Sequence, residues 1–102
     1  MRDKDRLIYL IGVTTSYDSI GQPVRTEKLR PVFARIRSVS LTEWTNANQL
    51  GLSAGVMAIM WTFEYKGEEF VIVGDRRYHV YRTYDTGDRI ELYLEEAVGH
   101  GS

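Results

Sequence analysis

Apolar and polar residues alternate along most of this chain, which is the pattern of half-buried β-strands. The last four apolar segments are separated by short turns, so we expect them to form an antiparallel meander. With two N-terminal strands this predicts a mainly β fold, a small antiparallel β-barrel or sandwich of about six strands with one short helix at about 41–50. The predicted strands cover residues 7–13, about 29–39, 56–65, 69–73, 77–84 and 90–95.

The alternation also predicts which side chains share a face. On the strand at about 29–39, one face carries Val32, Ala34 and Ile36, and the opposite face carries Phe33, Arg35 and Arg37. On the strand at 56–65, one face carries Met57, Ile59, Trp61, Phe63 and Tyr65. On the strand at 90–95, we expect Ile90, Leu92 and Leu94 to point inward.

The helix has clear start and stop signals. Ser40 and Glu43 have the spacing of a capping box, and Val39 and Trp44 that of a hydrophobic staple. Gly51 supplies a left-handed residue after the helix. Leu41, Trp44, Ala47 and Leu50 recur at helical spacing and predict an apolar stripe. On these grounds we expect a structural plug that closes one end of the sheet.

The segment from Thr14 to Glu27 is rich in turn-forming residues. We interpret it as a long hairpin loop or as two extended arms that lead into the strand at about Leu29. Residues 1–98 are expected to form one domain, because two independent cores are improbable in 102 residues. Residues 99–102 are expected to be a flexible tail, native or left over from cloning.

Composition is that of a soluble globular domain, with 43% hydrophobic and 26% charged residues. The sequence contains no cysteine, no secretory signal and no apolar run of membrane-spanning length. The net charge of −1 is unevenly divided, because residues 1–40 are basic and residues 41–102 are acidic. Such a division suits complementary faces that pack against copies of the chain or against a neighbour.

Candidate catalytic residues are few, and we expect no enzyme activity, no metal site and no cofactor. His79 lies mid-strand and is expected to be a half-buried or surface residue, while His100 is in the tail. The adjacent pairs Glu68–Glu69 and Glu95–Glu96 point to opposite sides of a strand, so we interpret them as solvated strand ends.

Single-stranded nucleic-acid binding is the alternative function. Arg35, Arg82, Tyr84 and Tyr78 would supply it through phosphate contacts and stacking, if Tyr78 shares a face with Arg82 and Tyr84. Against this alternative, the domain as a whole is not basic.

Three segments follow one another along the chain: VFARIRSVSLTEW, the A-x-x-x-G-L of Ala47 to Leu52, and EYKGEEFVIVGDRRYHVYRTYDTGDRIELYL. In this order they resemble the phage head–tail joining family, the small head-completion, adaptor or stopper proteins of tailed bacteriophages and prophages. The resemblance covers roughly Leu7 to Glu95.

The resemblance implies a small β-barrel that is monomeric when free and forms a ring beneath the portal at the capsid exit. It would dock on portal or adaptor ring proteins, retain packaged double-stranded DNA through non-specific proximity, and present a surface to tail-completion or tail proteins. Its place would be the virion head–tail junction, and the host cytoplasm before assembly, with no membrane role. Adaptor, stopper and tail-completion layers remain alternatives.

The resemblance also implies two sets of functional residues. A channel loop is expected at Thr14–Glu27 or at the Asn48–Gly55 connector. Trp44 is expected either in the core or in an interface. The predicted interface residues are Arg35, Arg37, Glu43, Trp44, Arg82 and Tyr84, and the predicted channel-loop residues are Tyr17, Asp18, Ser19, Gln22 and Arg25.

Overall fold

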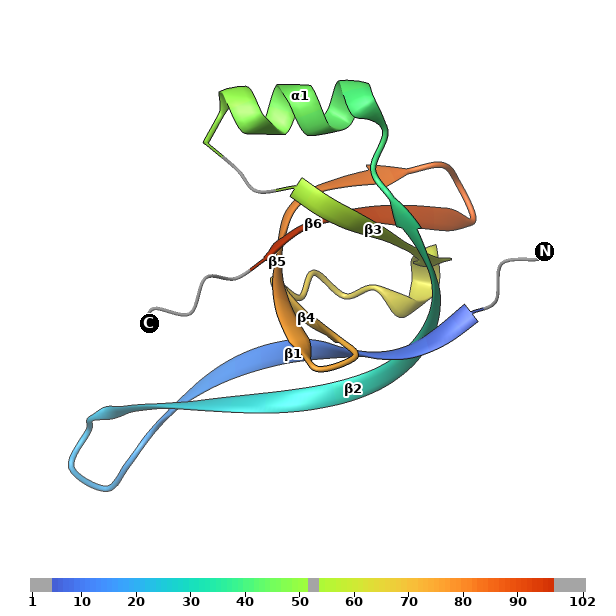
Figure 1. The fold of residues 1–102 in the computed structure, drawn as a ribbon. Helices are drawn as coiled ribbons and strands as arrows, with labels where there is room; N and C mark the ends of the chain where they lie inside the picture. The colour runs from blue at the N-terminus through green and yellow to red at the C-terminus, as the bar shows by residue number, and fades with distance from the viewer. Residues whose placement is uncertain (1–4, 52–53, 97–102) are drawn as a thin grey trace.

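A computed structural model describes residues 5–51 and 54–96, which form a closed antiparallel barrel with one helix (Figure 1). The strand order around the barrel is β1-β2-β3-β6-β5-β4. The prediction of a mainly β fold with one short helix is confirmed, and the barrel is the form it takes. The predicted tail at 99–102 lies outside the described residues. The elements are β1 (Asp5–Tyr17), β2 (Pro23–Ser38), α1 (Leu41–Gln49), β3 (Ala54–Trp61), the 3-10 helix η1 (Thr62–Glu64), β4 (Phe70–Val73), β5 (Arg76–Asp85) and β6 (Arg89–Glu96).

The core fills the inside of the barrel with side chains from alternate strand positions. The inward placement predicted for Ile90, Leu92 and Leu94 is confirmed. On β3 the inward residues are Ala58 and Met60. The buried cluster consists of Ile8, Leu10, Val32, Ala34, Ala58, Met60, Val71, Val73, Ile90, Leu92 and Leu94.

The connection from β3 to β4 corrects the predicted meander. β3 pairs with β2 and β6, whereas β4 pairs with β1 and β5, so the two strands lie on opposite sides of the barrel. The predicted strand 56–65 ends at Trp61, where Thr62 donates from its backbone N–H to the Asp88 carbonyl (2.8 Å) and from its hydroxyl to the Gly87 carbonyl (2.9 Å). These bonds turn the chain into η1, and residues 65–69 then carry it across to β4.

The β1–β2 hairpin extends far beyond the barrel (Figure 1). β1 and β2 stay paired as far as Tyr17 and Pro23, while β4 pairs only with Tyr9 to Ile11. We call the projecting part, residues 12–29, the arm. The long loop predicted for Thr14–Glu27 is therefore wrong, and its alternative of two extended arms is correct. The turn is closed by the Asp18 carboxylate, which accepts from the backbone N–H groups of Ile20 and Gln22.

Two ion pairs hold the base of the arm. Arg30 donates to the Glu68 carboxylate at 2.6 Å and to the Glu64 carbonyl at 2.7 Å. Arg77 of β5 donates to the Glu27 carboxylate at 2.9 Å. Burial raises the pKa of Glu68, but hydrogen bonds from Arg30 and the Lys66 backbone outweigh it and leave the pKa below its ordinary value. The interpretation of Glu68 as a solvated residue is wrong, because its side chain is almost completely covered.

The predicted helix is confirmed, with two corrections. Ser40 accepts from the backbone N–H of Glu43 at 3.1 Å, and Gly51 follows the helix with a φ of 79°. The reciprocal capping-box bond does not form, because the Glu43 carboxylate instead accepts from β5. The helix lies along the outer side of the barrel beside β3 and buries Ala47, so it is not the expected plug at one end (Figure 1).

Leu92 and Leu50 give a matched test of this core. We expect Leu92→Ala to lower the free energy of unfolding by about 2–5 kcal/mol, because Leu92 is fully buried and truncation leaves a cavity. Leu50→Ala should change it by less than about 0.5 kcal/mol, since Leu50 is 76% exposed. Urea denaturation followed by circular dichroism measures both. Equal losses would contradict the placement of Leu92 in the barrel core.

Candidate functional site

The outer side of β2, β3, β6 and β5 brings together residues far apart in the sequence. Strand register places them in two cross-strand rows that share one face of the sheet, which we call the outer face. Four of the six predicted interface residues, Arg35, Arg37, Arg82 and Tyr84, lie in these rows. One row is Arg35, Ile59, Glu91 and Tyr84, and the other is Arg37, Met57, Tyr93 and Arg82.

A bulge in β5 decides which of its side chains reach the outer face. The register shifts between Val80 and Arg82, which inserts one extra residue opposite β6. Tyr78 and Val80, before the bulge, pack against the core, whereas Arg82 and Tyr84, after it, are exposed. The predicted face shared by Tyr78, Arg82 and Tyr84 is therefore wrong for Tyr78, while Arg82 and Tyr84 share the outer face with Arg35.

Glu43 links the helix to the outer face. Its carboxylate accepts from the Tyr81 hydroxyl at 2.5 Å and from the Arg82 guanidinium. The Arg82 guanidinium also lies over the Tyr93 ring, 4.0 Å from its centroid. Because these contacts occupy Glu43 and Arg82 within the chain, both predicted interface residues serve to hold α1 against β5 and β6.

The electrostatics of this link follow from its hydrogen bonds. Burial raises the pKa of Glu43, but the bonds from Tyr81 and Arg82 outweigh burial and leave the pKa below its ordinary value. Burial, then the bond to Glu43, raises the pKa of Tyr81. At neutral pH the carboxylate is therefore charged and the phenol is protonated, as this arrangement requires.

Trp44, another predicted interface residue, is one of three large apolar residues in α1 or next to it that are exposed. Trp44 is 48% exposed, so the alternative that places it in the core is wrong. Leu41, the first helix residue, and Leu50, the C-cap residue, are largely exposed as well, while Ala47 is buried. We call Leu41, Trp44 and Leu50 the helix stripe.

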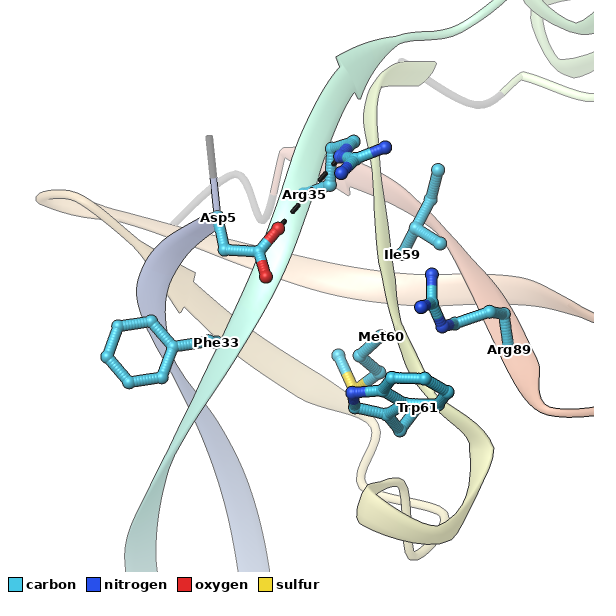
Figure 2. Close-up of a pocket in the computed structure, with 7 residues that line it drawn as sticks. All are labelled: Asp5, Phe33, Arg35, Ile59, Met60, Trp61 and Arg89. Carbon is cyan, nitrogen blue, oxygen red and sulfur yellow. Dashed lines mark ion pairs between the residues drawn. The ribbon is translucent and has the colours of Figure 1, made fainter. Parts of the chain in front are cut away.

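A small pocket opens beside the row that contains Arg35 (Figure 2). It has a volume of about 120 Å³. The Arg89 guanidinium lies over the Trp61 ring, 3.8 Å from its centroid, and Phe63 stacks on Trp61 at 6.3 Å between centroids. The lining residues are Asp5, Phe33, Arg35, Ile59, Met60, Trp61 and Arg89.

Sequence reasoning missed Trp61, Phe63 and Arg89 as candidate site residues. The available signal was that residues 56–61 are apolar on both faces, which is unusual for a strand that buries only one side. Arg89 gave no signal of its own, because it meets Trp61 only through the β3–β6 register.

The predicted channel-loop residues lie at the end of the arm. Tyr17 is 71% exposed, and Ser19, Gln22 and Arg25 are exposed too. Asp18 closes the turn, so its carboxylate has a structural role. The alternative loop at Asn48–Gly55 includes residues outside the described part of the chain.

The remaining candidate groups are paired within the chain. The His79 ring nitrogen Nδ1 lies 3.0 Å from a Glu95 carboxylate oxygen, and its side chain is part-exposed, which confirms the predicted half-buried position. Across residues 5–51 and 54–96, no three His, Cys, Asp or Glu side chains are grouped as a metal site would need. None of the described helices has the length and hydrophobicity needed to cross a membrane.

The chain was compared with known proteins. No protein-family model matches it, and no curated protein matches it.

Glu43→Gln tests the link between helix and barrel. We expect the free energy of unfolding at pH 7 to fall by about 1 kcal/mol, because charge-assisted hydrogen bonds from Tyr81 and Arg82 become neutral ones. Since the folded pKa of Glu43 lies below its unfolded value near 4.5, the wild-type advantage should be complete above pH 4.5 and vanish as the pH falls below it.

Urea denaturation at several pH values measures this difference. Glu69→Gln is the matched control, because Glu69 is exposed and its variant should follow the wild type closely at every pH. A Glu43→Gln deficit that persists unchanged below pH 4 would contradict the ionised link.

Proposed function

We propose that this protein is a structural subunit of the head–tail connector of a tailed bacteriophage or prophage. In this role it assembles as a ring under the portal, closes the DNA-filled head and offers an attachment surface to the tail. Two lines support the proposal: the resemblance of the ordered motifs to the head–tail joining family, and the distribution of exposed apolar surface. The distribution of exposed apolar surface is the observation that supports assembly into a ring.

Large exposed apolar residues occur in three places on the subunit. The first is the arm, where Tyr17, Ile20, Val24 and Leu29 face solvent. The second is the helix stripe, and the third is the pocket rim with the neighbouring Phe63. Exposed apolar surface on a small domain typically marks a protein interface. Several different surfaces on one subunit favour head-to-tail contacts, which generate a ring when the rotation closes.

The strand edges of the arm add a second attachment route. β1 has no partner from Gly12 onward on the side where β4 pairs, and β2 has none before Arg35 on the side where β3 pairs, within the described residues. Such edges carry unpaired backbone N–H and C=O groups that pair readily with another chain. In the proposed ring, the arm of one subunit lies against its neighbour or extends into the channel.

The first experiment is the oligomeric state of the purified protein, alone and after mixing with the portal complex from the same genome. The proposal expects a monomer that joins the portal as a ring, measured by light scattering and negative-stain microscopy. A protein that remains monomeric with portal, adaptor and tail components alike would overturn the proposal.

Variants at the arm tip test its part in assembly. We expect the double variant Tyr17→Ser, Ile20→Ser to abolish ring formation, because Ile20 is 75% exposed at the tip and both side chains are expected to pack on a neighbour. Thermal unfolding should match the wild type, since the tip lies outside the barrel core. Normal rings from the double variant would contradict a role for the arm.

Trp44→Ala tests the helix stripe independently. The variant should fold, with the free energy of unfolding lowered by less than about 1 kcal/mol, because half of the side chain is already exposed. Ring assembly should be weakened about tenfold or more, as expected for a central interfacial tryptophan. If the Trp44→Ala protein unfolds, or assembles as the wild type does, the result would contradict a role for the helix stripe in the interface.

A further inference from the structure

The pocket in Figure 2 contains the part-buried arginines that the chain leaves without a hydrogen bond. Two buried side-chain atoms of the described residues lack a hydrogen-bond partner, Arg35 Nε and Arg89 Nε. Both arginines line this pocket. By contrast, Arg30, also part-buried, donates to a carboxylate. Neither guanidinium donates a hydrogen bond to another described residue, so two such cations beside one small pocket point to an acceptor from outside the chain, which their remaining N–H groups would bind.

The contact with Trp61 positions the Arg89 guanidinium to bind an acceptor at the pocket. The guanidinium carbon lies over the Trp61 ring, 3.8 Å from the ring centroid, and this contact helps to hold the group in place. A carboxylate accepts two guanidinium N–H bonds side by side. Arg35 faces the same pocket from β2, with its Nε atom 3.9 Å from the Asp5 carboxylate, too far for a hydrogen bond (Figure 2).

The charge and size of the pocket select its occupant further. Arg35, Arg89 and Asp5 together carry one net positive charge, which a single carboxylate neutralises. The pocket volume of about 120 Å³ has room for a side-chain carboxylate. The rim residues Phe33 and Trp61 are exposed apolar surface, which favours a peptide with apolar neighbours around its acidic residue.

We propose that this pocket binds the carboxylate of an aspartate or glutamate side chain on a protein partner. This proposal rests on the proposed function, since in the ring the partner would be a neighbouring subunit or a connector protein. Arg35 and Arg89 bind the carboxylate oxygens, Trp61 positions Arg89, and Phe33 contacts the apolar flank of the acidic residue.

Single-stranded nucleic acid is the competing occupant and is less well matched. Arg89 covers one face of the Trp61 ring and Phe63 lies next to the ring, 6.3 Å away between centroids, which limits the room for a base to stack there. These contacts favour a peptide carboxylate over a phosphodiester.

The test is a titration of the full-length ¹⁵N-labelled protein, monitored by NMR at the arginine Nε–H and tryptophan indole resonances. The probes are acetyl-Leu-Glu-Leu-amide, its glutamine analogue, acetate, dimethyl phosphate and an oligothymidylate. We expect saturable binding of the glutamate peptide, with the glutamine peptide about tenfold weaker because the charge-assisted bonds are lost.

Variants assign the binding to the pocket. Arg35→Gln and Arg89→Gln should each weaken binding of the glutamate peptide about tenfold. Arg76→Gln is the matched control and should leave it unchanged, since Arg76 pairs with Glu96 away from the pocket. The amide resonances of each variant report whether the barrel remains folded.

The outcomes separate the possible occupants. Tighter binding of the glutamate peptide than of acetate supports a protein partner, and equal binding would assign the pocket to small carboxylic acids instead. Equal binding of the glutamate and glutamine peptides, absence of saturable binding, or tighter binding of the oligothymidylate would each overturn the proposal.

The ring experiment distinguishes this inference from the proposed function. If rings form on the portal while the pocket binds no carboxylate, the proposed carboxylate site is wrong and the connector function stands. If the pocket binds the carboxylate but the protein never joins a ring, the carboxylate site stands and the connector function is wrong.

Discussion

The barrel closes on a very short strand, and much of the architecture follows from that constraint. β4 spans Phe70–Val73 and pairs with only three residues of β1, whereas β1 pairs with β2 along its full length. The parts of β1 and β2 that extend beyond the residues paired with β4 must therefore project from the barrel as a two-stranded arm. The ion pairs Arg30–Glu68 and Arg77–Glu27 hold its base to the barrel wall, so the arm projects in a defined direction although it has no core of its own.

The outer face depends on a second local device, the bulge in β5. By shifting the register after Val80, it turns Arg82 outward toward Glu43. Ser40 starts the helix directly after β2, so Glu43 lies in the first turn, within reach of β5. The helix is thereby attached through the Glu43 link and the buried residue Ala47, and the helix stripe of Leu41, Trp44 and Leu50 remains exposed to solvent. A helix attached in this way is free to contribute apolar surface to a partner.

Local periodicity predicted the strands, the helix and its start and end, because each depends on residues close in sequence. It did not predict the path from β3 to β4. Alternation continues from Trp61 to Tyr65 in the sequence, yet the Thr62 bonds to the β5–β6 turn end the strand. The Arg30–Glu68 pair and the Arg89–Trp61 stacking were also beyond prediction, since barrel register alone joins residues so far apart. The pocket is built from such long-range pairs, so only the arginines and tryptophan themselves were visible in the sequence.

The uneven charge of the two sequence halves has a different meaning once the chain is folded. Arg30 from the basic half pairs with Glu68 from the acidic half, and Arg77 pairs with Glu27 in the opposite sense. The first pair lowers the charge difference between the two halves and the second raises it by the same amount, so together they leave the asymmetry unchanged, although these four charges are neutralised inside the subunit. The part-buried arginines without a hydrogen bond, Arg35 and Arg89, come one from each half and meet at one pocket. In the proposed recognition, the determining feature is therefore which guanidinium groups the fold leaves without a hydrogen bond, and total charge along the chain is a poor guide to it.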